Sequence, residues 1–444
     1  MIARIEGFEA GLKRLARHGS FAGASLPDHF AKRIEEVFGE PLTAQQVVAR
    51  IIAGVQARGD DAVRSFTESF DGTAPESFEV PRADWDAAWD EIGVDLQVAL
   101  TTAAERIRWF HERQTHPSWF EPDELGIFGQ IVRPLDTIGI YTPGGSAALP
   151  SSLLMTAIPA NVAGVREIVV TAPPRHNGGV APIILAAAKV AGVDRVFSIG
   201  GAQAIAALAF GTASVPRVDK ILGPGNIFVA LAKQQVFGIV GIDQIAGPTE
   251  TLLIADDSVD IGLVATDMLA QSEHGLDSSA ILITTSTAVA DRIGGELETQ
   301  LKYLDRADIA QGSLTRHGVV VVVNDLVEAV TLANAYAPEH LCLLVRDPWS
   351  LVPEIQNAGG VFIGEMSPEA LGDYAAGPSH VMPTGGTARF SSPVNVADFQ
   401  KVISVVGANA RAVEVLGPAT IALANAEGLG GHAAAIERRL RRPE

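Results

Sequence analysis

Short runs of aliphatic and β-branched residues alternate with helix-forming segments throughout the region from Gly139 to Gly247. This alternation constrains the fold more than any other feature of the chain. Short buried strands that alternate with helices of roughly ten residues are typical of βαβ units and a parallel sheet. We expect strands at residues 168–171, 196–199 and 220–222, and helices at residues 182–191 and 202–210.

The alternation resumes after Gly247 with a second set of elements. We expect strands at residues 251–255, 280–284, 318–323, 341–345 and 361–364, and helices at residues 259–271, 286–303 and 326–336. Residues 20–120 have apolar positions at helical spacing, and residues 1–19 have the pattern of a charged amphipathic helix. The tail is expected to hold a strand at residues 401–406 and a helix at residues 410–426. The sequence therefore predicts an α/β protein with two layers of parallel sheet, a helical N-terminal segment and a small C-terminal tail domain.

The size and charge of the chain argue against several classes of protein. A chain of 444 residues with 47% hydrophobic residues is expected to form at least two domains. Its net charge of −19 argues against a nucleic-acid partner, which requires a positively charged face. An uninterrupted apolar run of about eighteen residues is absent, so we expect no membrane span. Because the N-terminus also lacks the pattern of an export signal, we expect a cytoplasmic protein.

Cys342 is the only cysteine, which rules out an intrachain disulfide and a cysteine-based metal site. Its place in an apolar strand predicts a buried structural thiol and not a nucleophile. Other polar side chains must therefore supply any reactive or metal-binding groups. The chain has only 10 histidines, and several of them fall in dense polar segments at residues 271–274, 338–340, 372–380 and 427–432.

The segment Gln271-Ser272-Glu273-His274 is the most informative of these. Three-residue spacing at the end of a helix places Gln271 and His274 on one face. An amide oxygen and an imidazole directed at one point are suitable ligands for a metal such as Zn²⁺. Each histidine taken alone is more often a surface or hydrogen-bonded core residue. Four polar segments in an otherwise apolar, glycine-rich sequence favour a functional site.

Three glycine-rich loops follow expected strands, at residues 140–146, 200–203 and 223–226. In parallel α/β sheets, ligands bind beyond the carboxyl ends of the strands. Glycines allow the backbone to approach a phosphate, and the N-terminus of the next helix favours its charge. None of the loops has the full dinucleotide-binding fingerprint. Two interpretations therefore remain open: structural turns, or a nucleotide or phosphate site.

Two further segments contain possible reactive groups. Glu339 and His340 are adjacent and form a workable acid/base pair if the backbone directs both inward. The alternative is a helix-end glutamate beside a solvated histidine. Near the C-terminus, Glu427 and His432 flank a glycine-rich stretch. That stretch is either a frayed surface tail or an extension that completes a site in a neighbouring subunit.

Taken together, these segments resemble the histidinol dehydrogenase family, the NAD- and zinc-dependent enzymes of the last step of histidine biosynthesis. The resemblance extends over residues 30–437 and is most specific at residues 242–250 and 267–274. It implies the four-electron oxidation of an amino alcohol, L-histidinol, through the aldehyde to L-histidine. It also implies a homodimer with shared active sites.

The resemblance assigns roles to individual residues. It implies zinc ligands at Gln271, His274 and Asp373, with His432 of the second subunit as the fourth ligand. His340 would be the general base, and Glu339 would activate water.

These zinc ligands and His340 would also contact the substrate. Thr249 and, from the second subunit, Glu427 would do so as well. Tyr141, Gln203 and Asn226 would line the NAD site. His380 lies close in sequence to Asp373 and is given a supporting role only.

The resemblance also implies a division of the chain, in which the NAD-binding part is an incomplete Rossmann-like domain. Residues 140–247 would form that domain. Residues 36–139 and 248–393 would form a discontinuous catalytic, zinc-binding α/β domain. Residues 1–35 would be an N-terminal helical segment, and residues 394–444 would serve dimerisation and complete the site.

Thr249 stands where the family more usually has serine, which adds a methyl group beside the substrate. One methyl group changes substrate preference by about 1–3 kcal/mol. A second hypothesis therefore keeps the scaffold and changes the substrate to another small polar alcohol, such as a sulfonated diol. A third hypothesis is a zinc hydrolase in which Glu339 and His340 activate water without a redox step. It leaves the glycine-rich loops unexplained.

Overall fold

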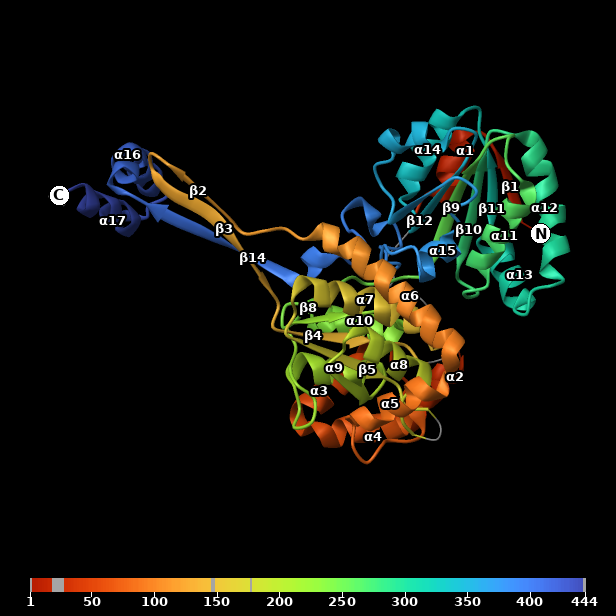
Figure 1. The fold of residues 1–444 in the computed structure, drawn as a ribbon, viewed down its shortest axis with the longest axis horizontal. Helices are drawn as coiled ribbons and strands as arrows, with labels where there is room; N and C mark the ends of the chain where they lie inside the picture. Colours follow the sequence, from red (N-terminus) through yellow and green to blue (C-terminus); the bar gives the residue numbers. More distant parts are fainter. Residues whose placement is uncertain (1, 18–27, 145–147, 176–177, 442–444) are drawn as a thin grey trace.

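The protein consists of two α/β bodies and a long arm that projects away from them (Figure 1). The computed structural model describes residues 2–17, 28–144, 148–175 and 178–441. Each body is built on a parallel sheet, and the arm contains an antiparallel one. The predicted α/β class with two parallel sheets is confirmed.

The first body contains a five-stranded sheet in the order β6–β5–β4–β7–β8, with all neighbours parallel. Its short apolar strands are fully or nearly buried, as expected for a sheet covered by helices on both faces. The strands are β4 (Thr137–Tyr141), β5 (Glu167–Ala172), β6 (Arg195–Ser198), β7 (Lys220–Leu222) and β8 (Gly241–Ile242). The helices between them are α7 (Pro150–Ala163), α8 (Pro182–Ala191), α9 (Gly201–Phe210) and α10 (Ile227–Val236).

A layer of N-terminal helices completes this body. Helices α5 to α8 form one apolar core with one face of the sheet, and α3, α4, α9 and α10 form a second core with the other. The prediction that residues 20–120 are mostly helical is therefore confirmed for the described residues. The helices are α2 (Asp28–Phe38), α3 (Ala44–Arg58), α4 (Asp60–Asp71), α5 (Arg82–Glu91) and α6 (Gly93–His111). The predicted domain boundaries stay a prediction, although α3 to α6 pack on this sheet and not on the later one.

The second body contains a six-stranded sheet in the order β1–β11–β10–β9–β12–β13, again parallel throughout. Helices α11 to α13 cover one face, and α1 and α14 cover the other. The strands are β1 (Ala3–Glu6), β9 (Glu250–Ala255), β10 (Ser279–Thr284), β11 (Val319–Val322), β12 (His340–Leu344) and β13 (Gly360–Ile363). The helices are α1 (Phe8–Leu15), α11 (Ile261–Ser272), α12 (Thr287–Leu301), α13 (Ala307–Arg316), α14 (Leu326–Tyr336) and α15 (Glu369–Tyr374).

The N-terminus differs from its sequence-based prediction. Residues 3–6 form β1, and only residues 8–15 of the expected amphipathic helix are helical. The strand pairs in parallel with β11, from Ala3 opposite Val319 to Glu6 opposite Val322. It satisfies backbone groups that the edge of the sheet would otherwise leave unpaired. This long-range pairing outweighs the local helical pattern of so short a segment.

The arm consists of the sheet β14–β3–β2 and the helix pair α16 and α17 (Figure 1). Its elements are β2 (Trp119–Asp123), β3 (Gly126–Pro134), β14 (Gln400–Ala408), α16 (Ala410–Ala426) and α17 (Gly430–Leu440). Among the described residues, short 3₁₀ helices connect other segments: η2 (Glu112–Gln114), η3 (Pro348–Glu354), η4 (Thr387–Arg389) and η5 (Val396–Phe399). Within the described ranges, the helices lack the combination of length and apolar character that crossing a membrane requires.

Candidate active site

Buried polar side chains gather at the amino-terminal ends of two neighbouring strands, β9 and β12. Thr249 precedes β9, and Glu339 immediately precedes His340, the first residue of β12. Ala337 has a φ of 53°, a left-handed conformation that ends α14 and redirects the chain into β12. Because β9 and β12 are paired, these side chains meet at the end of the sheet formed by the amino-terminal ends of its strands.

Glu339 is a buried carboxyl at the centre of this hydrogen-bonded cluster. Its Oε2 accepts a hydrogen bond from the Thr249 hydroxyl at 2.7 Å and another from the backbone N–H of Glu250 at 3.0 Å. The Thr249 hydroxyl in turn accepts one from Nε2 of Gln271 at 3.1 Å. Burial raises the pKa of Glu339 well above its usual range. A carboxyl in this state is suited to proton transfer near neutral pH.

An ion pair fixes the start of β9 beneath Glu339. Arg17 donates two hydrogen bonds to the carboxylate of Glu250, at 2.8 and 2.6 Å, and the Tyr336 hydroxyl donates a third at 3.0 Å. The guanidinium also lies 3.9 Å from the centre of the Tyr336 ring. A bidentate pair of this kind is geometrically specific. It therefore holds the backbone N–H on which Glu339 depends, a role for which the sequence offered no signal.

His340 lies between three carboxyl groups. Its Nδ1 is 3.3 Å from the carbonyl oxygen of Glu250, 3.8 Å from Oε2 of Glu339 and 3.7 Å from Oε2 of Glu369. Its Nε2 is buried without a hydrogen-bond partner, 3.8 Å from Oδ1 of Asp373. Burial lowers the pKa of His340 to about 3, so the ring is neutral at physiological pH. A proton on Nδ1 that is donated to the Glu250 carbonyl leaves Nε2 as a free proton acceptor.

Glu369 is a buried acid that the sequence analysis missed. Its carboxyl accepts hydrogen bonds from the Thr251 hydroxyl and from Sγ of Cys342, the latter at 3.2 Å. Burial raises the pKa of Glu369 to about 8. Thr251 and Cys342 were the available signal, because both interrupt otherwise aliphatic strands. Cys342 is 1% exposed and is the structural thiol that the sequence predicted.

Asp373 and His380 join this cluster to the first body. Oδ1 of Asp373 lies 4.0 Å from Nδ1 of His380, which contacts the Asp373 carbonyl oxygen at 2.7 Å. Nε2 of His380 is 3.0 Å from the hydroxyl of Ser152 in α7. Burial raises the pKa of Asp373 to about 6 and lowers that of His380 to about 4. The site therefore lies where the two sheets' helices and loops meet.

Gln271 and His274 lie at the end of α11, next to the same cluster. Gln271 touches Thr249 as described above, and the charge of His274 influences the pKa values of His340 and His380. Burial lowers the pKa of His274, which favours the neutral imidazole that a metal requires.

The donor set for a metal is suitable but incomplete in one chain. Gln271, His274 and Asp373 together offer an amide oxygen, an imidazole and a carboxylate, a combination that suits zinc. Nowhere in the described part of the chain do three or more His, Cys, Asp or Glu side chains form a metal-binding group. Zinc usually takes four ligands in proteins, so a fourth ligand beside these three would have to come from elsewhere.

The structure does not bring Glu427 and His432 to this cluster within one chain. Glu427 caps α16 and His432 lies in α17, at the outer end of the arm (Figure 1). Both are exposed. Their predicted part in the site thus depends on a second chain and stays a prediction.

Tyr141, Gln203 and Asn226 line one cavity of about 840 Å³ in the first body. It lies at the carboxyl ends of β4, β6 and β7, where ligands of parallel sheets bind. Tyr141 accepts a hydrogen bond from the backbone N–H of Gly201 at 3.2 Å, and burial raises its pKa to about 12. Oδ1 of Asn226 caps α10 by accepting from two backbone N–H groups. Gly145 and Ser146 of the first glycine-rich loop lie outside the described residues.

The cavity fits a dinucleotide cofactor. The helices α9 and α10 begin at its wall, and their N-termini favour phosphate charge. Gly223 has a φ of 108°, and a side chain there would meet the Tyr141 carbonyl oxygen at 2.2 Å. Only glycine therefore permits this close approach of β7 to β4. Both interpretations of the loops therefore stay open: Gly223 has a structural reason, and the cavity beside the loops has room for a ligand.

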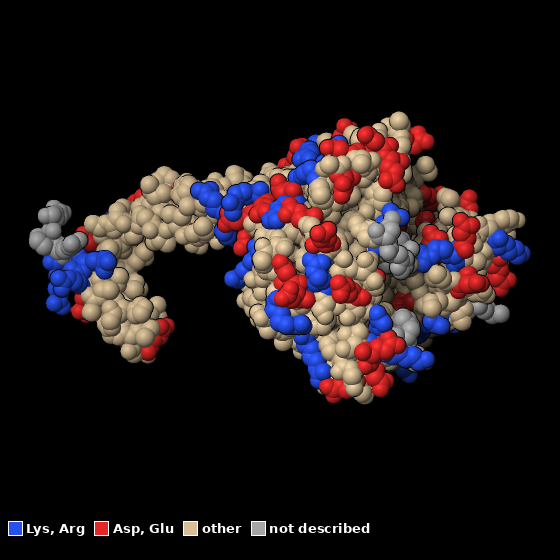
Figure 2. Space-filling view, turned by 90° about the horizontal axis from the view of Figure 1, so that it is seen from below, with Lys and Arg blue, Asp and Glu red and all other residues tan. Residues whose placement is uncertain are grey.

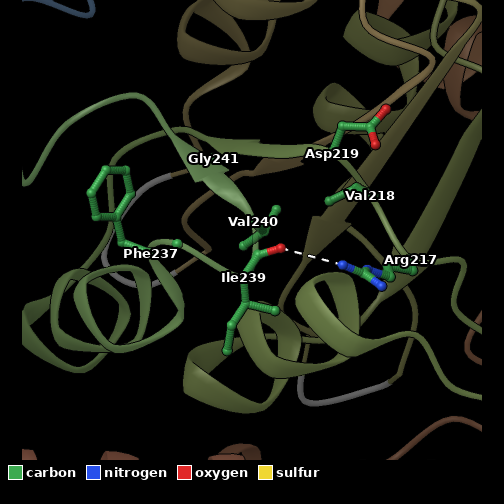
Figure 3. Close-up of a pocket in the computed structure, with 8 residues that line it drawn as sticks. Arg217, Val218, Asp219, Phe237, Ile239, Val240 and Gly241 are labelled. Atoms are coloured by element: carbon green, nitrogen blue, oxygen red, sulfur yellow. Dashed lines mark hydrogen bonds between the residues drawn. The ribbon is translucent and has the colours of Figure 1, made fainter. Parts of the chain in front are cut away.

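A second hollow, of about 560 Å³, is lined by Arg217, Asp219, Phe237 and Ile239, among others (Figure 3). Arg217 donates to the carbonyl oxygen of Ile239 at 3.3 Å across it (Figure 3). These residues precede β7 and β8, so the hollow lies at the amino ends of the strands. The glycine-rich loops lie at the other end of the strands. None of the predicted site residues lines this hollow.

Comparisons with known proteins agree on one family. The sequence model described as "Histidinol dehydrogenase" matches residues 39–440. A protein named histidinol dehydrogenase from Deinococcus radiodurans is 53% identical over 98% of this chain and 99% of its own length. One of the same name from Thermus thermophilus is 51% identical over 89% of this chain and 95% of its own. A crystal structure of histidinol dehydrogenase from Elizabethkingia anophelis superposes with a TM-score of 0.91 at 33% identity, covering 99% of this chain and 98% of that one.

Proposed function

Because this chain belongs to the histidinol dehydrogenase family, we propose that it oxidises L-histidinol to L-histidine with NAD as electron acceptor and zinc as bound metal. Membership of the family makes it an oxidoreductase of histidine biosynthesis. One observation supports this specific reaction most strongly. Four polar side chains converge at the amino-terminal ends of β9 and β12 in the six-stranded sheet: Thr249, Glu339, His340 and Asp373.

His340 is the proposed general base. Its unpartnered Nε2 is the free proton acceptor of the cluster, and the Glu250 carbonyl supports the required tautomer at Nδ1. The ring is therefore ready to accept the hydroxyl proton of an alcohol whose carbon loses hydride. Asp373, 3.8 Å from Nε2, would stabilise the imidazolium that results.

Glu339 is the proposed base for the second oxidation. An aldehyde must add water before it can lose hydride, and a carboxylate is a suitable base for that addition. Both of these hydrogen bonds are to Oε2, so Oε1 of Glu339 is available to a water molecule. Burial excludes other solvent from this point.

Zinc, when bound, would supply a positive charge that orients the substrate, and the nicotinamide would accept hydride. Gln271, His274 and Asp373 are the residues of this chain that would hold the metal. Tyr141, Gln203 and Asn226 line the cavity that would hold the cofactor. The segment that enters α7 connects the two places, because Ala148 lines the cavity and Ser152, in the first turn of the helix, contacts His380.

A homodimer with shared sites is part of the proposal, with a second copy of this chain covering the arm. Both faces of its sheet and its helix pair expose large apolar side chains. Figure 2 shows that few charged side chains lie along the arm. Exposed apolar surface of this extent is typical of an interface. The exposed apolar residues of the arm include Trp119, Phe120, Ile127, Val402, Ile403, Val406, Val415, Leu416, Leu423 and Leu429. His432 of a second copy could then supply the missing metal ligand.

The proposal is tested by following NADH absorbance with purified, zinc-loaded protein and L-histidinol. We expect two NADH per substrate consumed. We also expect a chelator to abolish turnover and added zinc to restore it. A ratio of one would remove the aldehyde-oxidising step and the role of Glu339. Turnover of a sulfonated diol but not of L-histidinol would overturn the substrate and leave the chemistry standing.

A further inference from the structure

The cavity of the first body contains a carboxylate that the proposed chemistry does not use. Asp71 is the last residue of α4 and lines the cavity together with Tyr141 and Gln203. Its Oδ2 is buried and has no hydrogen-bond partner among the described residues. Burial raises the pKa of Asp71 to about 6, so the charged form predominates at neutral pH. An unpaired buried carboxylate is unfavourable unless a ligand supplies hydrogen-bond donors.

Asp71 ends α4, which lies on the side of the first body away from the second body, whereas α7 lies on the side nearer to it (Figure 1). The segment that enters α7 leads from the cavity wall at Ala148 to Ser152, which contacts His380. A dinucleotide that reaches the cluster past α7 with its nicotinamide therefore leaves its adenosine beside Asp71.

Aromatic side chains at the same end support this orientation. The rings of Phe30 and Phe228 lie 5.5 Å apart, and both line the cavity. Phe70, the neighbour of Asp71, also lines it. Aromatic faces of this kind are suited to stacking on an adenine base. The adenosine ribose would then lie between these rings and the phosphate-binding helix N-termini.

The cations of the cavity do not offset the charge of Asp71. Nη1 of Arg33 donates to Glu36 at 2.8 Å, and its Nη2 donates to the Ser69 carbonyl oxygen. Arg175 is exposed. In the described part of the chain, Asp71 takes part in no ion pair. A second negative charge placed beside it would therefore be repelled.

We propose that Asp71 selects NAD over NADP by accepting hydrogen bonds from the 2′- and 3′-hydroxyls of the adenosine ribose. This inference rests on the proposed NAD-dependent function. A carboxylate pairs well with two neighbouring hydroxyls, whereas a 2′-phosphate removes one donor and adds like charge. The same residue thus supplies attraction for one cofactor and repulsion for the other, which is how large specificity ratios arise.

The test measures equilibrium binding by calorimetry with NAD, NADP, ADP-ribose and 2′-phospho-ADP-ribose. In the wild-type protein we expect the two ligands without the 2′-phosphate to bind more tightly than their phosphorylated counterparts. In Asp71→Asn we expect the dissociation constant for NAD to rise about ten- to hundredfold, because a hydrogen bond to a charged group is lost. The NAD-to-NADP preference should fall by at least about tenfold, since the repulsion disappears.

Asp60→Asn is the matched control. Asp60 begins the same helix, its Oδ1 is likewise buried without a partner, and it is not among the residues lining the cavity. Its substitution should leave both affinities within about twofold of the wild type. An equal loss in both variants would mean that α4 is merely disturbed and would overturn the inference.

A measurement on the unaltered protein keeps the inference falsifiable if Asp71→Asn does not fold. NAD that lacks the adenosine 2′-hydroxyl should bind the wild type at least about tenfold more weakly than NAD. Equal affinity would overturn the role of Asp71. A wild-type protein that binds none of these nucleotides would instead overturn the proposed NAD dependence. A wild-type protein that binds NAD and NADP equally would overturn only the selection.

Discussion

At the scale of single residues, one hydroxyl joins the components of the cluster. The Thr249 hydroxyl donates to Glu339 and accepts from Gln271, so it links the proposed water-activating base to a proposed zinc ligand. The family resemblance implied only a substrate contact for Thr249. Both threonine and serine provide this hydroxyl, so the exchange of serine for threonine preserves the link and changes only the added methyl group.

We therefore expect Thr249→Val to lower kcat about ten- to hundredfold, because the shape is kept while the donor to the Glu339 carboxylate is lost. Thr249→Ser is the matched control, since it retains both hydrogen bonds, and its kcat should stay within about threefold of the wild type. Steady-state kinetics with L-histidinol check both. A loss in Thr249→Ser with none in Thr249→Val would show that the methyl group, and not the hydroxyl, is what matters.

Asp71 makes a second residue-scale prediction, which concerns stability. Burial raises its pKa from 3.8 to about 6, so folding disfavours the charged form. Asp71 therefore costs little stability below pH 3.8, its cost grows as the pH rises from 3.8 to about 6, and the full cost is present above that. The other ionisable side chains that line the cavity are Tyr141, Arg33 and Arg175.

Asp71→Asn should accordingly become more stable relative to the wild type as the pH rises. The full shift corresponds to at most about 3 kcal/mol, and we expect a gain of about 1 kcal/mol between pH 5 and pH 7.5. Urea unfolding of both proteins at these two pH values, without nucleotide, measures it. A difference that is constant with pH, or that shrinks as the pH rises, would contradict the burial of this carboxylate.

At the scale of elements, the period of the sequence predicted most of the secondary structure. The strands and helices expected between residues 168 and 222 all form, with ends that shift by at most a few residues. The spacing of Gln271 and His274 correctly placed both at the end of one helix. These predictions succeeded because they depend on the spacing of apolar and polar residues over a few neighbouring positions, which can be read from one sequence.

The elements that the sequence did not predict depend on distant partners. Strand β1 forms because β11 offers an edge more than three hundred residues away in sequence, from Ala3 to Val319. Glu369 enters the cluster through hydrogen bonds to Thr251 and Cys342 on two other strands. Asp71 reaches the cavity at the end of a helix that lies outside the βαβ pattern. No local spacing carries information of this kind.

At the scale of the whole molecule, the arm and the cluster are each unfinished in one chain. The arm holds exposed apolar side chains and carries Glu427 and His432 far from the body (Figure 1). The cluster offers an amide, an imidazole and a carboxylate to a metal, one ligand short of the four that zinc usually takes in proteins. A second copy that covers the arm and supplies His432 resolves both features at once.

Mixing two inactive variants tests this arrangement. Glu339→Gln and His432→Ala should each be inactive alone, and His432→Ala should also retain less zinc. Random exchange of subunits makes half of the dimers mixed, and each mixed dimer has one site with both defects and one site with none. About a quarter of wild-type activity should therefore return. Mixing Glu339→Gln with His340→Ala is the control: because both changes lie in the same body, every site keeps a defect and no activity should return. No recovery in the test pair would mean that each chain completes its own site and that the arm serves another purpose. Recovery in the control would mean that Glu339 and His340 do not act in one site.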